Sequence, residues 1–190
     1  MHEITREGTS FEIKNYPWDV SGYKPKTIIT IGYDDNGFKV HGVSYETEIH
    51  ASRFINNTDI SADNCMELFM KFAPDTDINY INIEINPNSA VNNSVRENRE
   101  NSQYVSDEMI KMLDVKAAVY EDRWEIDYYI PVSYIKKLIP TYEHKTGNII
   151  KGNLYKCSED FNPHFGCFSN IEWEEPDFHR PEFFTEFKLV

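Results

Sequence analysis

Apolar residues recur at every second position over much of this chain, as in strands with one buried face. The alternation is clearest in residues 65–72 and 80–86. Similar runs follow at 26–33, 124–130 and 153–157, and shorter ones begin near residues 11, 38 and 117. The pattern predicts an all-β fold, an antiparallel β-sandwich of jelly-roll type with only one or two short helical turns.

Turn and cap residues mark where the predicted elements begin and end. Residues 34–37, with the sequence DDNG, lie between two alternating runs and predict a hairpin. Ser106 precedes two acidic residues and an apolar run, as an N-cap does. A later helical turn is predicted to be capped by Ser133 and ended by Pro140. The polar run 88–103 is predicted to be an exposed loop or a ribbon at the sheet edge.

The non-core face of the two clearest strands carries Glu67, Asn82 and Glu84. If these strands pair as a hairpin, the three side chains lie together on that face. Carboxylates and amides in such a place exchange hydrogen bonds well with sugar hydroxyls. The same residues also suit the solvated side of an ordinary sandwich. Both interpretations remain open at the level of sequence.

The segment 151–187 combines residues that break regular structure with many aromatic rings. Pro163, Gly166, Pro176 and Pro181 predict a long loop between a strand near residue 153 and a final strand. Its rings are those of Phe161, Phe165, Phe168, Trp173 and Phe178. A loop of this composition either folds onto the core or presents rings to a ligand.

Composition and charge narrow the classes of partner. The 190 residues are 40% hydrophobic, which suits a single domain over residues 1–190. The net charge of −13 disfavours nucleic acid and anionic membranes, which attract basic proteins. No run approaches the roughly 20 apolar residues that span a bilayer. The first residues lack the apolar core of a secretion signal, so the expected location is cytoplasmic unless a signal was removed.

The three cysteines have two interpretations. Cys65, Cys157 and Cys167 are widely spaced, as expected for small buried thiols in a reducing compartment. The alternative is a zinc site formed by Cys157, His164, Cys167 and His179, although the close pairs typical of structural zinc motifs are missing.

Known catalytic motifs are missing from the sequence. It has no glycine-rich phosphate loop, nucleophile elbow or HExxH motif. Acidic residues are so frequent that a pair at glycosidase spacing is no evidence for hydrolysis. The acidic loop 34–36 could hold calcium through oxygen ligands, without EF-hand spacing. The sequence thus predicts a non-catalytic domain that needs no cofactor, with calcium as an optional structural ion.

Several segments together resemble the family 9 carbohydrate-binding modules. These are YDDNGFKVHG, DNCMELFMKF followed by YINIEINPN, the pattern W.I...IP.S.I, and NLYKC, PHFG.FS and PDFHRPEFF near the end of the chain. The resemblance is clearest over residues 26–190. It implies a sandwich of the DOMON-like superfamily that binds a mono- or oligosaccharide without cleaving it, as part of polysaccharide catabolism.

The resemblance also implies polar site residues. In sugar-binding members the glutamate that matches Glu67 contacts the ligand. Arginines often lie near the binding face where Arg96 and Arg99 occur, although a solvated loop is also compatible with these two residues. With Asn82 and Glu84 they form the polar part of the expected carbohydrate site.

The aromatic part of the expected site departs from the family. Ser61 stands where a tryptophan stacks on the sugar, and Phe168 replaces another tryptophan. The rings of Tyr155, Phe168 or Trp173 are therefore expected to supply stacking. Other functions remain open: a domain of a glycoside-hydrolysing system or an enzyme subunit, a haem-binding sandwich with Met70 or a histidine as axial ligand, or a scaffold without a ligand.

Overall fold

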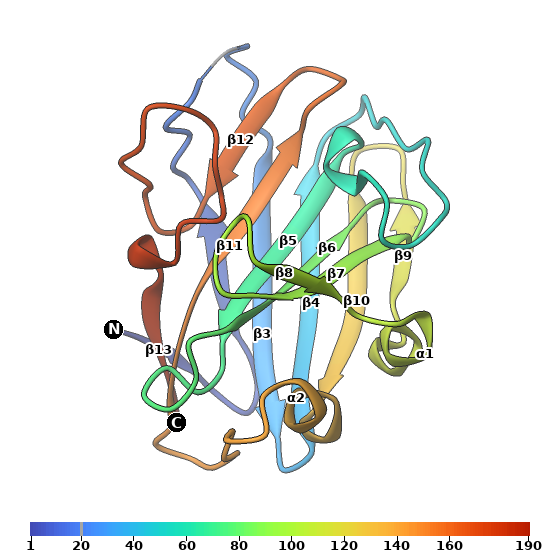
Figure 1. Cartoon of the computed structure of the whole chain (residues 1–190). Coiled ribbons are helices and arrows are strands. Elements are labelled where there is room, and N and C mark those ends of the chain that lie inside the picture. The colour runs from blue at the N-terminus through green and yellow to red at the C-terminus, as the bar shows by residue number, and fades with distance from the viewer. Residues whose placement is uncertain (20) are drawn as a thin grey trace.

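Two β-sheets pack face to face in the computed structural model, which describes residues 1–19 and 21–190 (Figure 1). The larger sheet contains, in order, β1 (His2–Ile4), β13 (Thr185–Leu189), β11 (Ile149–Ser158), β5 (Cys65–Lys71), β6 (Tyr80–Ile85), β7 (Val91–Arg96) and β8 (Ser102–Tyr104), with β12 (His164–Cys167) also paired to β11. The smaller sheet contains β2 (Thr9–Ile13), β3 (Lys26–Asp34), β4 (Gly37–Tyr45), β10 (Trp124–Pro131) and β9 (Lys116–Val119). The predicted β-sandwich is confirmed.

The core lies between the sheets and is built by the alternating positions. Met66 and Leu68 of β5 and Ile83 of β6 are buried in one cluster with Ile31 of β3 and Ile126 of β10. Each such side chain contributes roughly 1.5–3 kcal/mol when it is fully buried. Because successive strand residues point to opposite faces, the polar residues of β5 and β6 are forced onto the outer face.

Both predicted hairpins form. In the β3–β4 hairpin Asp34 pairs with Gly37, where a side chain would collide with the carbonyl oxygen of Ile130. In the β5–β6 hairpin Glu67 lies directly opposite Glu84. The register therefore places these two carboxylates on the same outer face.

The polar run 88–103 forms a ribbon at the sheet edge, which is one of the two predicted alternatives, and not an exposed loop. Its first part forms β7, which is hydrogen-bonded between β6 and β8 and is mostly buried. Asn92 and Ser94 point away from the core but are covered by polar neighbours. Hydrophobicity cannot reveal a strand that is buried against polar groups.

The helical segments are short, as predicted. Helix α1 (Asp107–Ile110) begins after Ser106 and continues into the 3-10 turn η2 (Lys111–Leu113). Helix α2 (Val132–Leu138) begins after Pro131, so the predicted cap at Ser133 is wrong. The helix starts two residues earlier, and the Val132 amide donates to the carbonyl oxygen of Asn36.

The carboxylates of the β3–β4 turn have protein partners. Asp34 Oδ1 accepts hydrogen bonds from the Tyr129 hydroxyl at 2.7 Å and from the Asn36 amide at 2.9 Å. Asp35 Oδ1 lies 2.7 Å from Arg6 Nη2. Calcium binding at this turn stays a prediction.

In the described residues, 1–19 and 21–190, no helix has the length and apolar character needed to cross a bilayer.

The C-terminal segment 168–184 folds back over the outer face of the larger sheet, where it is drawn as the red loop beside β12 and β11 (Figure 1). Phe178 stacks on Tyr155 of β11, with ring centres 4.2 Å apart, and His179 stacks on Phe69 of β5 at 4.9 Å. The Trp18 indole nitrogen donates to the carbonyl oxygen of Trp173 and ties the segment to the N-terminal part of the chain. The segment therefore forms one wall above the outer face.

Candidate functional site

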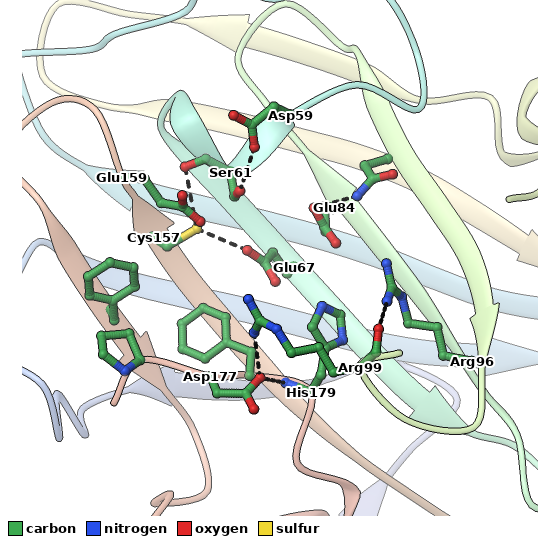
Figure 2. Close-up of a pocket in the computed structure, with 14 residues that line it drawn as sticks. Asp59, Ser61, Glu67, Glu84, Arg96, Arg99, Cys157, Glu159, Asp177 and His179 are labelled. Atoms are coloured by element: carbon green, nitrogen blue, oxygen red, sulfur yellow. Dashed lines mark hydrogen bonds and ion pairs between the residues drawn. The ribbon is translucent and has the colours of Figure 1, made fainter. Parts of the chain in front are cut away.

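A cavity of about 270 Å³ lies between this C-terminal segment and the outer faces of β5, β6, β7 and β11. Figure 2 shows Glu67 and Glu84 pointing toward its centre from neighbouring strands. Ser61, on the 3-10 turn η1 (Ile60–Ala62), lies at one side, and Arg99 and Asp177 lie at the other (Figure 2). The cavity is thus lined mainly by polar and charged side chains.

Glu84 is held by two amide groups. Its Oε1 accepts a hydrogen bond from Asn82 Nδ2 at 2.6 Å, and its Oε2 accepts one from Asn92 Nδ2 at 2.9 Å. Burial raises the pKa of Glu84 to about 7, although both amides and the charge of Arg96 act in the opposite direction. Glu84 therefore changes its protonation state near neutral pH.

Glu67 is buried with few polar partners. The Cys157 thiol donates to its Oε1 at 2.9 Å. In the part of the chain that the structure describes, no lysine or arginine forms an ion pair with Glu67. Burial, together with the nearby Cys157 and Glu84, holds the pKa of Glu67 well above its usual range. This carboxyl group can donate a hydrogen bond while protonated and accept others.

A polar network continues from Asn82 to the rim. Asn82 Oδ1 accepts from the Ser94 hydroxyl and from Arg96 Nε, the latter at 3.3 Å. Arg96 Nη1 donates to the carbonyl oxygen of Arg99 at 3.0 Å, and Arg99 Nη1 lies 2.7 Å from Asp177 Oδ1. Asn82 therefore supports the lining residues from below, while both arginines reach the cavity.

Asn92 leaves one hydrogen-bonding atom unused. Its Nδ2 donates to Glu84, but its Oδ1 is buried without a partner and the residue lines the cavity. An unsatisfied buried acceptor costs about 1–3 kcal/mol, so a ligand hydroxyl that donates to it would recover that energy.

The rings of the cavity are not those that the sequence predicts. Phe165 and Phe178 line it. Tyr155 is fully buried beneath Phe178 and donates its hydroxyl to the carbonyl oxygen of Phe178 at 3.1 Å, so it cannot face a ligand. Phe165 and Phe178 belong to the aromatic loop that the sequence reveals, but nothing in the sequence distinguishes them from its other rings.

Two further expected rings lie outside the cavity lining. Phe168 packs at the other side of β11 against His2 and Phe11, with ring centres 4.9 and 5.3 Å apart. Trp173 is half exposed, and the Arg180 guanidinium covers its ring at 3.4 Å. The structure corrects the expected stacking partners because the loop turns both rings away from the carboxylates.

All three cysteines are buried and free, as predicted, but the alternative zinc set is not assembled. His164 Nε2 lies 2.7 Å from Lys156 Nζ, on the core side of β11, whereas Cys157 faces the cavity. Burial lowers the pKa of His164 to about 4 and that of His179 to about 3, so both rings are neutral at pH 7. Met70, considered as a haem ligand, is buried in the core.

Comparisons with known proteins agree with this fold. A protein of Bacteroides uniformis ATCC 8492, described as a candidate carbohydrate-binding protein, is 25% identical with a TM-score of 0.82, over 97% of this chain and 87% of that one. A family 9 module of Caldicellulosiruptor kristjanssonii in complex with cellotriose is 11% identical with a TM-score of 0.68, over 99% and 92% of the two chains. The module of that organism in complex with glucose is 12% identical with a TM-score of 0.68, over 97% and 85%. These last two likenesses show the fold alone.

A comparison with curated proteins gave no match. The model of carbohydrate-binding family 9 matches residues 4–189. This match confirms the resemblance drawn from the sequence motifs. The chain belongs to carbohydrate-binding family 9, a family of non-catalytic carbohydrate-binding modules.

Proposed function

We propose that the cavity above β5 and β6 binds one or two rings of a neutral, glucose-type sugar. The observation that carries this proposal is the floor of the cavity, where Glu67 and Glu84 face the same space beside the unpaired Asn92 oxygen. The volume of about 270 Å³ lies just below the roughly 300–1,000 Å³ of pockets that enclose drug-sized ligands. The module would hold its sugar without cleaving it and would serve polysaccharide breakdown through that binding.

The lining offers both kinds of hydrogen-bonding partner that sugar hydroxyls need. Glu84 and Asn92 present acceptor oxygens, and Arg96 and Arg99 present donor nitrogens. A hydroxyl is both a donor and an acceptor, so neighbouring hydroxyls of one ring can use both groups. This mixture is better suited to a polyol than to an apolar ligand.

Stacking is available on one side only. Phe178 of the C-terminal segment and Phe165 of β12 line the cavity, whereas Ser61, on the side opposite Asp177 in Figure 2, has no ring. The apolar face of a sugar ring packs well on an aromatic ring. We therefore expect weaker binding than a module with rings on both sides would show.

Charge favours a neutral sugar over a uronic acid. The cavity is lined by two arginines and five carboxyl residues, which are Asp59, Glu67, Glu84, Glu159 and Asp177. A carboxylate on the ligand would meet like charges and lose affinity. Glucuronic acid is thus a useful negative control for glucose.

The proposal is tested by calorimetric titration and thermal shift with glucose, cellotriose and glucuronic acid, each with calcium and with chelator. A ligand at 100 times its dissociation constant stabilises by about 2.7 kcal/mol, or roughly 5–11 °C for a domain of this size. Glu67→Ala and Glu84→Ala are expected to weaken binding at least about tenfold, since each removes a hydrogen-bonding carboxyl group from the floor of the cavity and a tenfold loss corresponds to about 1.4 kcal/mol.

Glu121→Gln is the matched control, because Glu121 is an exposed carboxylate between β9 and β10 of the other sheet. It is expected to leave sugar affinity unchanged. Wild-type affinity in both Glu67→Ala and Glu84→Ala would place the sugar elsewhere and refute the proposed site.

A further inference from the structure

Two thiols and a carboxylate meet at the floor of the cavity. Cys65 of β5 lies directly opposite Cys157 of β11 in the sheet register, and Glu67 follows two residues after Cys65 on the same face. One ligand atom of each residue lies within 4.8 Å of the other two. We propose that Cys65, Cys157 and Glu67 form a binding site for one thiophilic divalent ion, with Zn²⁺ as the expected occupant.

The geometry fits a small tetrahedral ion. Zinc binds thiolates at about 2.3 Å and carboxylate oxygens at about 2.0–2.2 Å, which separates neighbouring ligand atoms by roughly 3.4–3.8 Å. The three side chains need only small rotations to reach this spacing from their present positions. Paired strands fix their backbones, so the site is largely organised before an ion arrives.

The chemical type of the three ligand atoms determines which metal ions the site favours. Thiolates are soft ligands that favour zinc, cadmium and copper(I), whereas calcium and magnesium require mostly hard oxygen ligands. Two sulfur atoms and one oxygen atom therefore distinguish this site from any calcium site at the acidic turns. The site also differs from the set of Cys157, His164, Cys167 and His179 suggested by sequence spacing, because only Cys157 is shared.

A bound cation would offset the energetic cost of burying the Glu67 carboxyl group. Cys65, Glu67 and Cys157 are each at most 3% exposed. Buried carboxylates in proteins are usually ion-paired or coordinate a metal, yet in residues 1–19 and 21–190 Glu67 has no lysine or arginine partner within ion-pair distance. A divalent ion would replace the proton of Glu67 and provide the positive charge that its carboxylate then needs.

Metal binding at this site must release protons. Burial raises the pKa of the Cys65 thiol to about 12, and the neighbouring Cys65 and burial raise the pKa of Cys157 well above its usual range. Thiol and carboxyl groups must lose their protons to coordinate an ion, so binding at these three ligands releases protons and becomes tighter as pH rises. The other charged groups that act on the cluster are Glu84 of β6, Glu159 after β11 and Lys156 on the opposite face of β11.

The ion has a route in and an open coordination position. Cys157 and Glu67 line the cavity, whereas Cys65 lies beside them outside its lining. Three protein ligands leave the fourth tetrahedral position for water or another oxygen donor, as in zinc sites with an open position. If the proposed sugar site is correct, a sugar hydroxyl can occupy that position, and zinc then changes sugar affinity.

The test uses metal-free wild-type protein kept reduced with a phosphine. Zn²⁺ is titrated by calorimetry, and Cd²⁺ is titrated while thiolate-to-metal charge-transfer absorption is recorded in the ultraviolet. One ion per chain is expected, with release of protons from the ligand groups. Cys65→Ser and Cys157→Ser are each expected to weaken binding at least 100-fold, because each removes a direct thiolate ligand.

Cys167→Ser is the matched control, since Cys167 is also buried and free but lies on β12 outside the cluster. It is expected to keep the wild-type metal affinity. Thermal unfolding in chelator checks that each variant is folded, and Cys65→Ala replaces Cys65→Ser if the serine variant is not.

The proposal is overturned if wild-type protein shows no stoichiometric binding or no charge-transfer band, or if both ligand variants bind as wild type does. Sugar affinity is measured separately in chelator, where Cys65→Ser is expected to match wild type. Metal binding without sugar binding would refute only the proposed function, and sugar binding without metal binding would refute only the metal site.

Discussion

Replacing Lys156 with methionine tests how the core is held together beneath β11. Lys156 is fully buried, and its Nζ donates to His164 Nε2 at 2.7 Å and to the Cys157 carbonyl oxygen at 3.1 Å. Nζ also lies 3.2 Å from Glu46 Oε1. All three ammonium protons are therefore directed at protein acceptors, and methionine keeps the length of the side chain without the charge.

The Lys156→Met substitution is destabilising because it leaves the charge of Glu46 unpaired, and Glu46 is only 4% exposed. Burial by itself would raise the Glu46 pKa, but the Lys156 charge and the hydrogen bond from Trp124 Nε1 outweigh it and hold that pKa below its usual value. Breaking one side of a buried ion pair costs roughly 3–5 kcal/mol. That is a large part of a typical stability of about 5–15 kcal/mol, and it lowers Tm by roughly 6–20 °C.

The stability lost in Lys156→Met should depend on pH and on the side chain at position 46. Without Lys156, burial should raise the Glu46 pKa of the variant above its usual value of 4.5, so Glu46 takes up a proton at higher pH there than in wild type. The stability difference between wild type and Lys156→Met therefore shrinks as pH falls from the raised pKa of the variant toward the wild-type pKa below 4.5. Adding Glu46→Gln removes the unpaired charge, so the double variant should recover at least about 2 kcal/mol relative to Lys156→Met.

The free energy of unfolding is measured by denaturation in guanidinium chloride, followed by tryptophan fluorescence at pH 7.5 and 4.5. The four proteins compared are wild type, Lys156→Met, Glu46→Gln and the double variant. Lys151→Met on the same strand is the control, since Lys151 pairs with Glu186 at 3.2 Å with its side chain 41% exposed. Its expected cost is about 0–1 kcal/mol. A cost below about 1 kcal/mol for Lys156→Met, or a double variant that equals the sum of the single ones, would refute the reasoning.

Two further predictions concern the cavity. The pKa of Glu84 rises from 4.5 to about 7 on folding, so its ionisation lowers stability as pH increases through that window, by roughly 3 kcal/mol in total. Glu84→Gln should gain that amount relative to wild type between pH 4 and pH 8 in denaturant titrations, and parallel pH profiles would contradict this. Ser61→Trp adds a ring to the cavity lining and should tighten glucose binding about 2- to 10-fold by calorimetry, whereas unchanged affinity would show that position 61 does not face the sugar.

Much of the fold could be predicted because the alternation of apolar and polar residues along a strand is a local property of the sequence. The period of two in β5 and β6 identified their buried faces, and the turn at residues 34–37 identified a hairpin. The burial of strand β7 could not be predicted, because Asn92, Ser94 and Arg96 are buried against polar partners from β6. Such burial depends on neighbours that lie elsewhere in the chain.

The polar half of the candidate site could also be located from the sequence. Alternation placed Glu67 and Glu84 on one outer face, and the family motifs added Arg96 and Arg99. The aromatic half could not be located, because the rings that face the cavity depend on the path of the loop after β12. That path turns Phe178 toward the carboxylates and the neighbouring rings away from them.

The sequence by itself determined which residues of each strand face the core and which face outward, because this depends only on neighbouring positions in the chain. Only the tertiary structure decided which outward residues meet. Cys157 and Glu67 are separated by 90 positions, and they come within hydrogen-bonding distance because β11 pairs with β5 in one particular register. A shift of one residue in that register would move the thiol to the opposite face and remove the cluster.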